Sequence, residues 1–484
     1  MALRGWPVIE LISHILAVKP VILRTDALIF LLVSVVLAFA VYARRREHLH
    51  APWRRVVGSR IGAATLIVLA AYVVIALLDS LHFREPLPTR DNGGRPTYAI
   101  EVLSVLDLLL RDQREHSEKT YSAPFATHLF VKETMERDDG TRVRGYPRLV
   151  YGGAQLDDPA VERGGDIATR AALGVLKGVG IWGVFALAAF GWVLRRRACS
   201  GAEAVRILAC GDQVAWPAIL AAVACVMVVG SIAMSLAGGY HIFGTDKVGQ
   251  DVFYQTIKSI RTALVIGTLT TLVMLPFAIA LGIMAGYFRG WIDDVIQYIY
   301  TTLNSIPGVL LIASAVLTLQ VYIDTHADLF ETTAARADLR LLFLCLILGV
   351  TSWTGLCRLL RGETLKLNEV DYVQAAVAFG VRHARVMSRH LLPNVMHIVL
   401  ITVVLDFSGL VLAEAVLSYV GVGVDPTMFS WGNMINSARL EMAREPMVWW
   451  SLLAAFVFMF VLVLAANLFA DAVRDAFDPR LRKA

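Results

Sequence analysis

The sequence predicts an all-α polytopic membrane protein, and three observations lead to this fold class. Of the 484 residues, 57% are hydrophobic and 18% are charged, whereas soluble globular domains are about 45–50% apolar and about 25% charged. The mean hydropathy is +0.62. The apolar residues form long uncharged runs, and a helix needs roughly 20 such residues to cross hydrocarbon about 30 Å thick. These figures exclude a disordered chain, a collagen-like repeat and a single soluble domain.

The apolar runs predict nine membrane spans. These spans are expected at residues 27–42, 61–78, 172–194, 214–237, 262–287, 295–322, 341–358, 398–420 and 447–470. The segment 7–23 is also apolar, but it holds Glu10, His14 and Lys19. Such a pattern favours an amphipathic helix in the membrane interface, and a tenth span at this position stays open.

Basic residues predict the orientation of these spans. The net charge is +5, from 45 Lys and Arg against 40 Asp and Glu, and in membrane proteins basic residues collect in cytoplasmic loops. The segments between successive spans lie alternately on the two sides of the membrane. Those on one side carry about twice as many Lys and Arg residues as the short segments on the other. The segments of this basic set are 43–60, 195–215, 288–294, 359–394 and 471–484. We therefore expect a cytoplasmic C-terminus and, with nine spans, an external N-terminus.

The spans divide the chain into four parts. These parts are an N-terminal membrane region with two spans (1–78), an external segment (79–171), the third span with a basic cytoplasmic linker (172–213) and a membrane domain of six spans (214–484). In the external segment, residues 100–110 have the pattern of an amphipathic helix. The rest of that segment is rich in turn residues, so we expect a small, loop-rich external cap.

Motifs of soluble enzymes are absent or lie in a membrane context. The sequence has no G-x-x-x-x-G-K-[ST] loop, which predicts that the chain does not bind ATP by itself, and it has no HExxH, CxxC or G-x-S-x-G motif. Its five cysteines suggest neither a disulfide framework nor a zinc site, and no cleaved signal peptide is expected. Residues 178–183 match G-x-G-x-x-G, but this stretch and Gly282-x-x-x-Gly286 lie in apolar spans. Close helix packing explains both better, and we expect no catalytic, cofactor-binding or metal-binding residue.

The cytoplasmic loop 371–394 is longer and more regular than a simple connection needs. Its alanines at 375, 376 and 378 favour a short helix, and Gly380 can stop or turn that helix. A second, basic helix is expected over 381–392, ending before Pro393. These elements predict a rigid helix–turn–helix that projects from the membrane.

This loop resembles the EAA loop of ABC importer permeases, whose pattern is E-A-A, three residues, Gly, then nine residues before I-x-L-P. Ala375, Ala376, Gly380, Leu392 and Pro393 match this pattern, while Gln374 stands in place of Glu and His390 in place of Ile. Asp371 and Tyr372, with the run 390–394, resemble the dipeptide, oligopeptide and nickel branch. The resemblance implies that an ATPase is coupled through Asp371, Tyr372, Gln374, Ala375, Ala376, Gly380, His390 and Pro393.

Three further segments resemble the same branch in the same order. An external motif, similar to G-T-D-x-x-G-R-D with Gln250 in place of Arg, consists of Gly244, Thr245, Asp246, Gly249 and Asp251. The runs 417–423 and 430–434 resemble L-S-F-L-G-L-G and S-W-G-N-M, and 471–480 resembles the C-terminal tail. The matches cover about 214–484, so the first three spans and the external segment depart from the usual six-span subunit.

The resemblance implies the permease subunit of a dipeptide, oligopeptide or nickel-type ABC importer. Its permease core of six spans is preceded by about three extra N-terminal spans and an external insert. Such a subunit forms half of the translocation path for peptides or peptide-like substrates in a bacterial inner membrane. The implied partners are a second permease subunit, two cytoplasmic ATPase subunits that bind ATP and Mg, an external solute-binding protein and membrane lipid, but no nucleic acid.

Two carboxylates interrupt the eighth span. Asp406 and Glu414 lie about 80° apart around a helix, and a charge in mid-membrane usually lines a water-filled path or pairs within the bundle. Glu414 occupies the family's acidic position before L-S-F-L-G-L-G, which favours a structural or gating role, whereas Asp406 could line the path or be hydrogen-bonded between helices. Two alternatives stay open: an ion-coupled secondary transporter that uses both groups, and a membrane-anchored structural or sensor protein built on segment 79–171.

Overall fold

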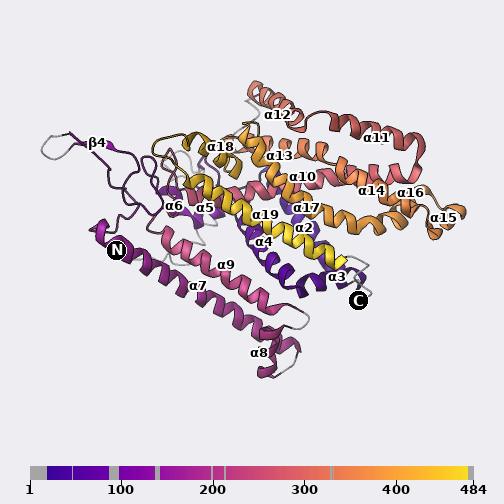
Figure 1. Cartoon of the computed structure of the whole chain (residues 1–484), viewed down its shortest axis with the longest axis horizontal. Helices are drawn as coiled ribbons and strands as arrows, with labels where there is room; N and C mark the ends of the chain where they lie inside the picture. The colour runs from indigo at the N-terminus through magenta and orange to yellow at the C-terminus, as the bar shows by residue number, and fades with distance from the viewer. Residues whose placement is uncertain are drawn as a thin grey trace, which may run out of the picture.

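The computed structural model describes residues 19–45, 47–86, 98–136, 142–197, 200–211, 214–326, 330 and 332–477. In this part of the chain, nine helices are long and apolar enough to cross a membrane, which confirms the predicted all-α polytopic fold. They are Arg24–Tyr42, Arg60–Asp79, Pro159–Arg197, Trp216–Ala237, Val252–Phe288, Gly308–Thr325, Thr333–Leu367, His383–Tyr419 and Trp450–Phe477. Figure 1 shows β4 at one end of the molecule and α15, with the end of α19, toward the other.

The N-terminal region contains a small antiparallel sheet and two spans. Its elements are β1 (Lys19–Val21), α2 (Arg24–Arg44), α3 (Glu47–Gly58), α4 (Arg60–Asp79), β2 (His82–Arg84) and β3 (Leu103–Ser104). In the sheet, β2 lies between β1 and β3, with Phe83 opposite Pro20 and Leu103. The amphipathic helix expected over 7–23 falls mostly outside the described residues, and its last part is wrong because β1 is a strand.

The described residues between α4 and α7 are rich in loops, as the sequence predicts for segment 79–171, and this part is called the cap below; residues 159–171 instead belong to α7. The cap contains α5 (Val105–Leu109), α6 (Arg111–Glu115) and an antiparallel hairpin of β4 (Glu133–Glu136) and β5 (Arg142–Gly145). The helix predicted over 100–110 is wrong in extent, because α5 begins only at Val105. The Ser104 hydroxyl accepts a hydrogen bond from the Asp107 amide, and the Asp107 carboxylate accepts one from the Ser104 amide, which completes a capping box.

Two long helices form a pair beside the rest of the bundle (Figure 1). They are α7 (Pro159–Arg197) and α9 (Trp216–Ala237), joined through α8 (Gly201–Cys210). A Cβ atom on Gly174 would lie 2.7 Å from the Cα atom of Ile232 on α9, and one on Gly178 would lie 2.7 Å from the Cα atom of Val228. Glycine therefore permits the close approach of the two helices. This contact confirms the packing interpretation for Gly178, but not for Gly180 and Gly183, where nothing lies within 4 Å of a Cβ atom.

The rest of the chain forms the membrane domain around α10 (Val252–Phe288). The other elements are α11 (Gly290–Ser305), α12 (Gly308–Thr325), α13 (Thr333–Ser352), α14 (Thr354–Leu367), α15 (Asp371–Ala378), α16 (His383–Val386), a π-helical turn (Met387–Leu391), α17 (Leu392–Tyr419), α18 (Trp431–Glu441) and α19 (Trp450–Phe477). Helix α10 packs on α13, α14, α17 and α4. Gly282 and Gly286 lie against the backbone of α14, at Cys357 and Arg361, which confirms their packing role.

Several observed helices have other bounds than the predicted spans; α7, for example, begins at Pro159 rather than at residue 172. The span expected over 295–322 is broken at Ile306 and Pro307, where Ile306 is extended and α12 restarts at Gly308. The cause is Pro307, since proline lacks an N–H donor and disfavours a helical residue before it. Lys258 and Arg261 were expected in the loop before a span at 262, but they lie within α10.

Candidate coupling surface and external ion-pair network

The loop 371–394 forms a helix–turn–helix, as the sequence predicts. After α15, the Gly380 amide donates to the Val377 carbonyl at 2.9 Å and the Val381 amide to the Ala376 carbonyl at 3.1 Å. This pair of bonds is the Schellman arrangement that ends a helix. Gly380 has φ of +74°, a conformation that costs glycine little and β-branched residues much. The turn therefore depends on the glycine backbone.

The helix–turn–helix is fixed to the membrane domain by buried side chains. Val373, Val386 and Leu391 are fully buried in the same apolar cluster as Tyr287 of α10 and Leu360 of α14. The movement of this segment is therefore tied to that of α10 and α14.

Two polar contacts strengthen this attachment. The Tyr287 hydroxyl lies 2.7 Å from Nδ1 of His383. The Asn394 side-chain amide donates to the Tyr372 hydroxyl at 2.9 Å, so it joins the two ends of the loop.

The outer face of the helix–turn–helix is uncovered. Asp371, Tyr372, Gln374 and Ala375 are exposed, as is Gly380, while Ala376 and His390 are partly exposed. Phe379 is 88% exposed, the highest value among the large hydrophobic side chains in the described part of the chain. Sequence reasoning missed Phe379, although an aromatic residue next to a turn glycine in a polar loop is a usable signal. An exposed aromatic residue on a rigid turn is typical of a docking contact.

The helix predicted to end before Pro393 does not end there. Residues 387–391 form a π-helical turn, and α17 continues from Leu392 through Pro393 into the membrane. Proline can occupy the first turn of a helix, where its missing N–H donor is not needed. The π-helical turn marks the change of register between α16 and α17. The helix–turn–helix is consequently continuous with the eighth span.

The motif of Gly244, Thr245, Asp246, Gly249 and Asp251 contacts the cap directly. A Cβ atom on Gly249 would lie 1.7 Å from the Glu118 carbonyl oxygen, and one on Gly244 would lie 2.3 Å from the Ser122 carbonyl oxygen. Both glycines also have positive φ. The Thr245 hydroxyl donates to the Thr120 carbonyl at 2.8 Å. The cap segment 118–122 is therefore held directly against this motif.

The two aspartates of the motif organise the start of α10. Asp246 accepts hydrogen bonds from the Val248 and Gln250 amides, both at 2.9 Å, which closes the turn. Asp251 caps α10 by accepting from the Phe253 and Tyr254 amides. These contacts support a structural role for both carboxylates.

A buried charged triad lies beneath the cap. His241 Nδ1 lies 2.7 Å from Asp251, and its Nε2 lies 3.5 Å from Glu118. Burial alone would raise the pKa of Glu118, but His241 and three backbone N–H groups lower that pKa to about 2. Burial alone would lower the pKa of His241, but the Asp251 and Glu118 carboxylates raise it to about 9. Glu118 and His241 are therefore both charged at neutral pH.

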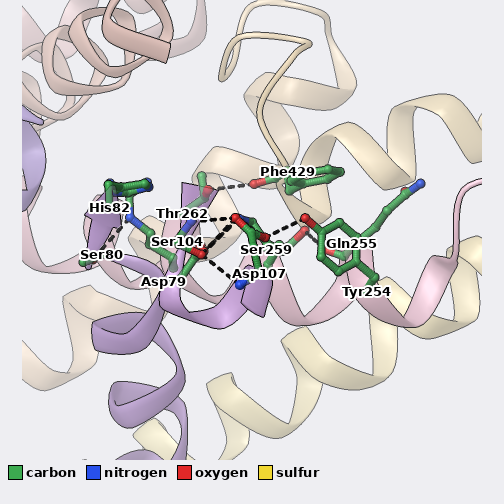
Figure 2. Close-up of polar contacts among 12 residues, drawn as sticks. Asp79, Ser80, His82, Ser104, Asp107, Tyr254, Gln255, Ser259, Thr262 and Phe429 are labelled. Atoms are coloured by element: carbon green, nitrogen blue, oxygen red, sulfur yellow. Dashed lines mark hydrogen bonds and ion pairs between the residues drawn. The ribbon is translucent and has the colours of Figure 1, made fainter. Parts of the chain in front are cut away.

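A second network, drawn in Figure 2, joins the cap to α10. Lys258 Nζ lies 2.9 Å from Asp79 at the end of α4 and 2.8 Å from Asp107 of α5. The Ser104 hydroxyl donates to Asp79 at 2.7 Å, and the Tyr254 hydroxyl donates to Asp107 at 2.7 Å. The extra N-terminal elements are thus fixed to the membrane domain by a buried ion pair.

One turn further along α10, Arg261 joins the first span to the same helix. Its guanidinium lies 2.5 Å from Asp26 and donates to the Ser80 hydroxyl at 3.2 Å. Asp26 also lies 2.7 Å from His82 Nδ1. Beside this group, Asp338 of α13 accepts from the Thr25 hydroxyl. Sequence reasoning missed this network, because the partners are far apart in the chain.

The two carboxylates of the eighth span lie in different surroundings. Glu414 is buried and accepts from the Ser418 hydroxyl at 2.7 Å, and a Cβ atom on Gly432 would lie 2.8 Å from its Oε1. Asp406 is partly exposed on the side of α17 that also carries the exposed Gly409. In the described part of the chain, Asp406 has no hydrogen-bond or ion-pair partner. The structure therefore does not bring the two carboxylates together.

Comparison with known proteins places these features in a family context. The profile of the binding-protein-dependent transport system inner membrane component matches residues 278–483. The oligopeptide transport system permease protein OppC of Mycobacterium tuberculosis strain H37Rv is 31% identical over 245 residues, 51% of this chain and 78% of that protein.

Two other relatives are similar over comparable lengths. The dipeptide transport system permease protein DppC of Bacillus subtilis is 29% identical over 50% of this chain and 70% of that protein. The glutathione transport system permease protein GsiD of Pectobacterium atrosepticum is 32% identical over 50% of this chain and 73% of that protein. About half of the chain is therefore shared with these relatives.

Proposed function

We propose partners, an orientation and a substrate class for this chain, which belongs to the family of binding-protein-dependent transport system inner membrane components. The chain is a multi-pass inner membrane permease subunit of an ABC importer. Subunits of this family are not ATPases, so they work with an ATPase and a binding protein. The alternative of an ion-coupled secondary transporter is wrong, because the relatives are ABC importer permeases.

The proposed assembly contains a second permease subunit, two cytoplasmic ATPase subunits and an external solute-binding protein. In this assembly the ATPase subunits hold ATP and Mg, and this chain binds no cofactor. The observation that carries the proposal is the exposed, firmly anchored turn at Phe379 and Gly380. We assign this turn as the contact through which ATPase movement reaches α10, α14 and α17.

The proposed orientation has α15 and the C-terminus in the cytoplasm. The excess of basic residues in the loops at that end supports it. The cap and β4 lie at the opposite end (Figure 1) and are therefore assigned to the external side, where a binding protein would arrive.

The proposed cargo is a peptide or a peptide-like molecule. The names of the similar permeases, which refer to oligopeptides, dipeptides and glutathione, support this class. Asp406 adds a physical reason, because a partly exposed carboxylate on a span can pair with the free amine of a peptide. We assign the Asp406 side of α17 to the translocation path, and Glu414 to a structural or gating role near the external end.

Replacing Gly380 with valine tests the coupling role of the turn. No atom lies within 4 Å of a Cβ atom at this position, so the effect arises from the backbone conformation alone. A strained backbone of this kind costs about 1–3 kcal/mol, and the turn should change shape. We expect normal membrane insertion, with transport and substrate-stimulated ATP hydrolysis reduced about tenfold or more in the reconstituted complex.

Gly380→Asn is the matched control for this test. Asparagine adds a side chain of similar size but tolerates positive φ, so this variant should retain most of the transport activity. Equal activity of the valine variant and the wild-type complex would contradict the coupling role.

Replacing Asp406 with asparagine tests the proposed path and cargo together. The substitution keeps shape and hydrogen bonding but removes the charge, so uptake of a peptide with a free amine should fall several-fold. Uptake of the same peptide with an acetylated amine should not change, and basal ATP hydrolysis should stay normal. Equal uptake of both peptides by the wild type and by the variant would show that Asp406 does not line the translocation path.

A further inference from the structure

A groove opens between the N-terminal spans at the end of the bundle that carries α3 and α8. It has a volume of about 770 Å³ and is lined by parts of α2, α3, α7, α8 and α9. The Ala215 amide donates to the Val57 carbonyl at 3.1 Å, which joins the start of α9 to α3 below the groove. Figure 1 shows α8 at the end of the α7 and α9 pair. The groove belongs to the extra N-terminal spans and is distinct from the coupling turn.

The wall of the groove is mainly apolar and aromatic. Phe39, Trp53, Trp192 and Trp216 line it, and the rings of Trp192 and Trp216 lie 5.9 Å apart. Phe39 lies on the exposed face of a membrane span, so the groove is open toward the hydrocarbon. Tryptophan side chains gather where the acyl chains of a bilayer meet its headgroups.

The charged side chains among the described residues that line the groove are all cationic. Arg54, Arg196 and Arg197 line it, and none of the described lining residues is acidic. The Arg196 guanidinium lies 5.2 Å from the Trp192 ring centroid, a cation–π contact that holds it at the groove. Arginine suits phosphate because its planar donors match phosphate oxygens. The groove therefore combines a phosphate-binding rim with an apolar wall.

We propose that this groove binds an anionic phospholipid, with its phosphate against Arg196 and its acyl chains along Phe39 and Trp192. Basic pockets between membrane helices at the cytoplasmic surface bind anionic headgroups in this way. The occupant is a lipid rather than a soluble phosphate, because the apolar wall faces the hydrocarbon. The bound lipid fills the space between α2 and the α7 and α9 pair and holds these elements together.

Native mass spectrometry of the full chain in detergent tests this proposal. Purified protein is titrated with phosphatidylglycerol and, separately, with phosphatidylcholine of the same acyl chains. The wild type should bind phosphatidylglycerol more tightly. Arg196→Gln should weaken phosphatidylglycerol binding about fivefold, since one arginine near an anionic surface contributes about 1 kcal/mol, and it should leave phosphatidylcholine binding unchanged.

Two further variants keep this test specific. Ala40→Trp places a large side chain in the groove and should abolish retention of phosphatidylglycerol with every arginine intact. Arg206→Gln removes an exposed charge on α8 that does not line the groove and should have no effect. Equal loss with Arg206→Gln, full retention with Ala40→Trp, or displacement of the lipid by excess glycerol phosphate would overturn the proposal.

Discussion

Phe379→Ala is expected to separate the permease from its ATPase partner. Phe379 is 88% exposed, and it directly precedes the glycine turn that fixes its position. Aromatic residues at the centre of an interface commonly contribute about 2 kcal/mol or more, so the dissociation constant of the ATPase should rise roughly thirtyfold. Transport should fall in parallel, because hydrolysis no longer moves α15. Titration of the ATPase against permease in lipid nanodiscs measures this effect.

The control for this measurement is Leu440→Ala. Leu440 is an apolar residue of α18, 68% exposed, and it lies at the external end in the proposed orientation. The substitution removes a similar apolar surface but should leave ATPase binding unchanged. If Phe379→Ala binds the ATPase as tightly as the wild type does, the turn is not the docking contact.

Arg261→Gln is expected to cause the largest loss of stability. Arg261 is 4% exposed, and its partner Asp26 is fully buried. Removing one member of a buried ion pair typically costs about 3–5 kcal/mol of unfolding free energy, and here it leaves Asp26 with only His82 beside it. The first span and the cap should also detach from α10 more readily. Denaturant unfolding in detergent, followed by tryptophan fluorescence, measures the change in unfolding free energy.

Arg336→Gln provides the matched control, because Arg336 forms a half-exposed ion pair with Asp324 at 3.8 Å. Exposed pairs contribute about 1 kcal/mol or less, so this variant should unfold nearly as the wild type does. Equal unfolding free energies of the two variants would show that the Arg261 network does not fix the N-terminal region.

The local part of the fold can be predicted from sequence because it depends on neighbouring residues. Long apolar runs predict the spans, and Gly380 after three alanines predicts the turn that φ of +74° confirms. The same reasoning fails at Pro393, where proline occupies the first turn of a helix instead of ending one. It also fails at Ile306, since the apolar pattern continues across Pro307 while the helix does not.

The contacts that hold the N-terminal region could not be predicted, because they join distant residues. Arg261 and Asp26 are 235 positions apart in the chain. Hydrophobic periodicity reports only on neighbouring residues, so it cannot predict a contact between these two. Lys258 and Arg261 were therefore assigned to a loop, although an i,i+3 cationic pair before an apolar run also fits a helix with buried partners. The sequence did offer one signal for these ion pairs: a carboxylate stands at one end of each of two spans, Asp26 in α2 and Asp79 in α4.

A cross-linking experiment tests most directly whether the helix–turn–helix is the cytoplasmic contact with the ATPase. In a variant without the five native cysteines, a single cysteine replaces either the exposed Ala378 of α15 or the exposed Thr134 of β4. The cysteine at 378 should cross-link to the ATPase subunit and resist an impermeant maleimide added outside. The cysteine at 134 should react with that maleimide and form no such cross-link. External labelling at 378, or an ATPase cross-link at 134, would contradict this assignment.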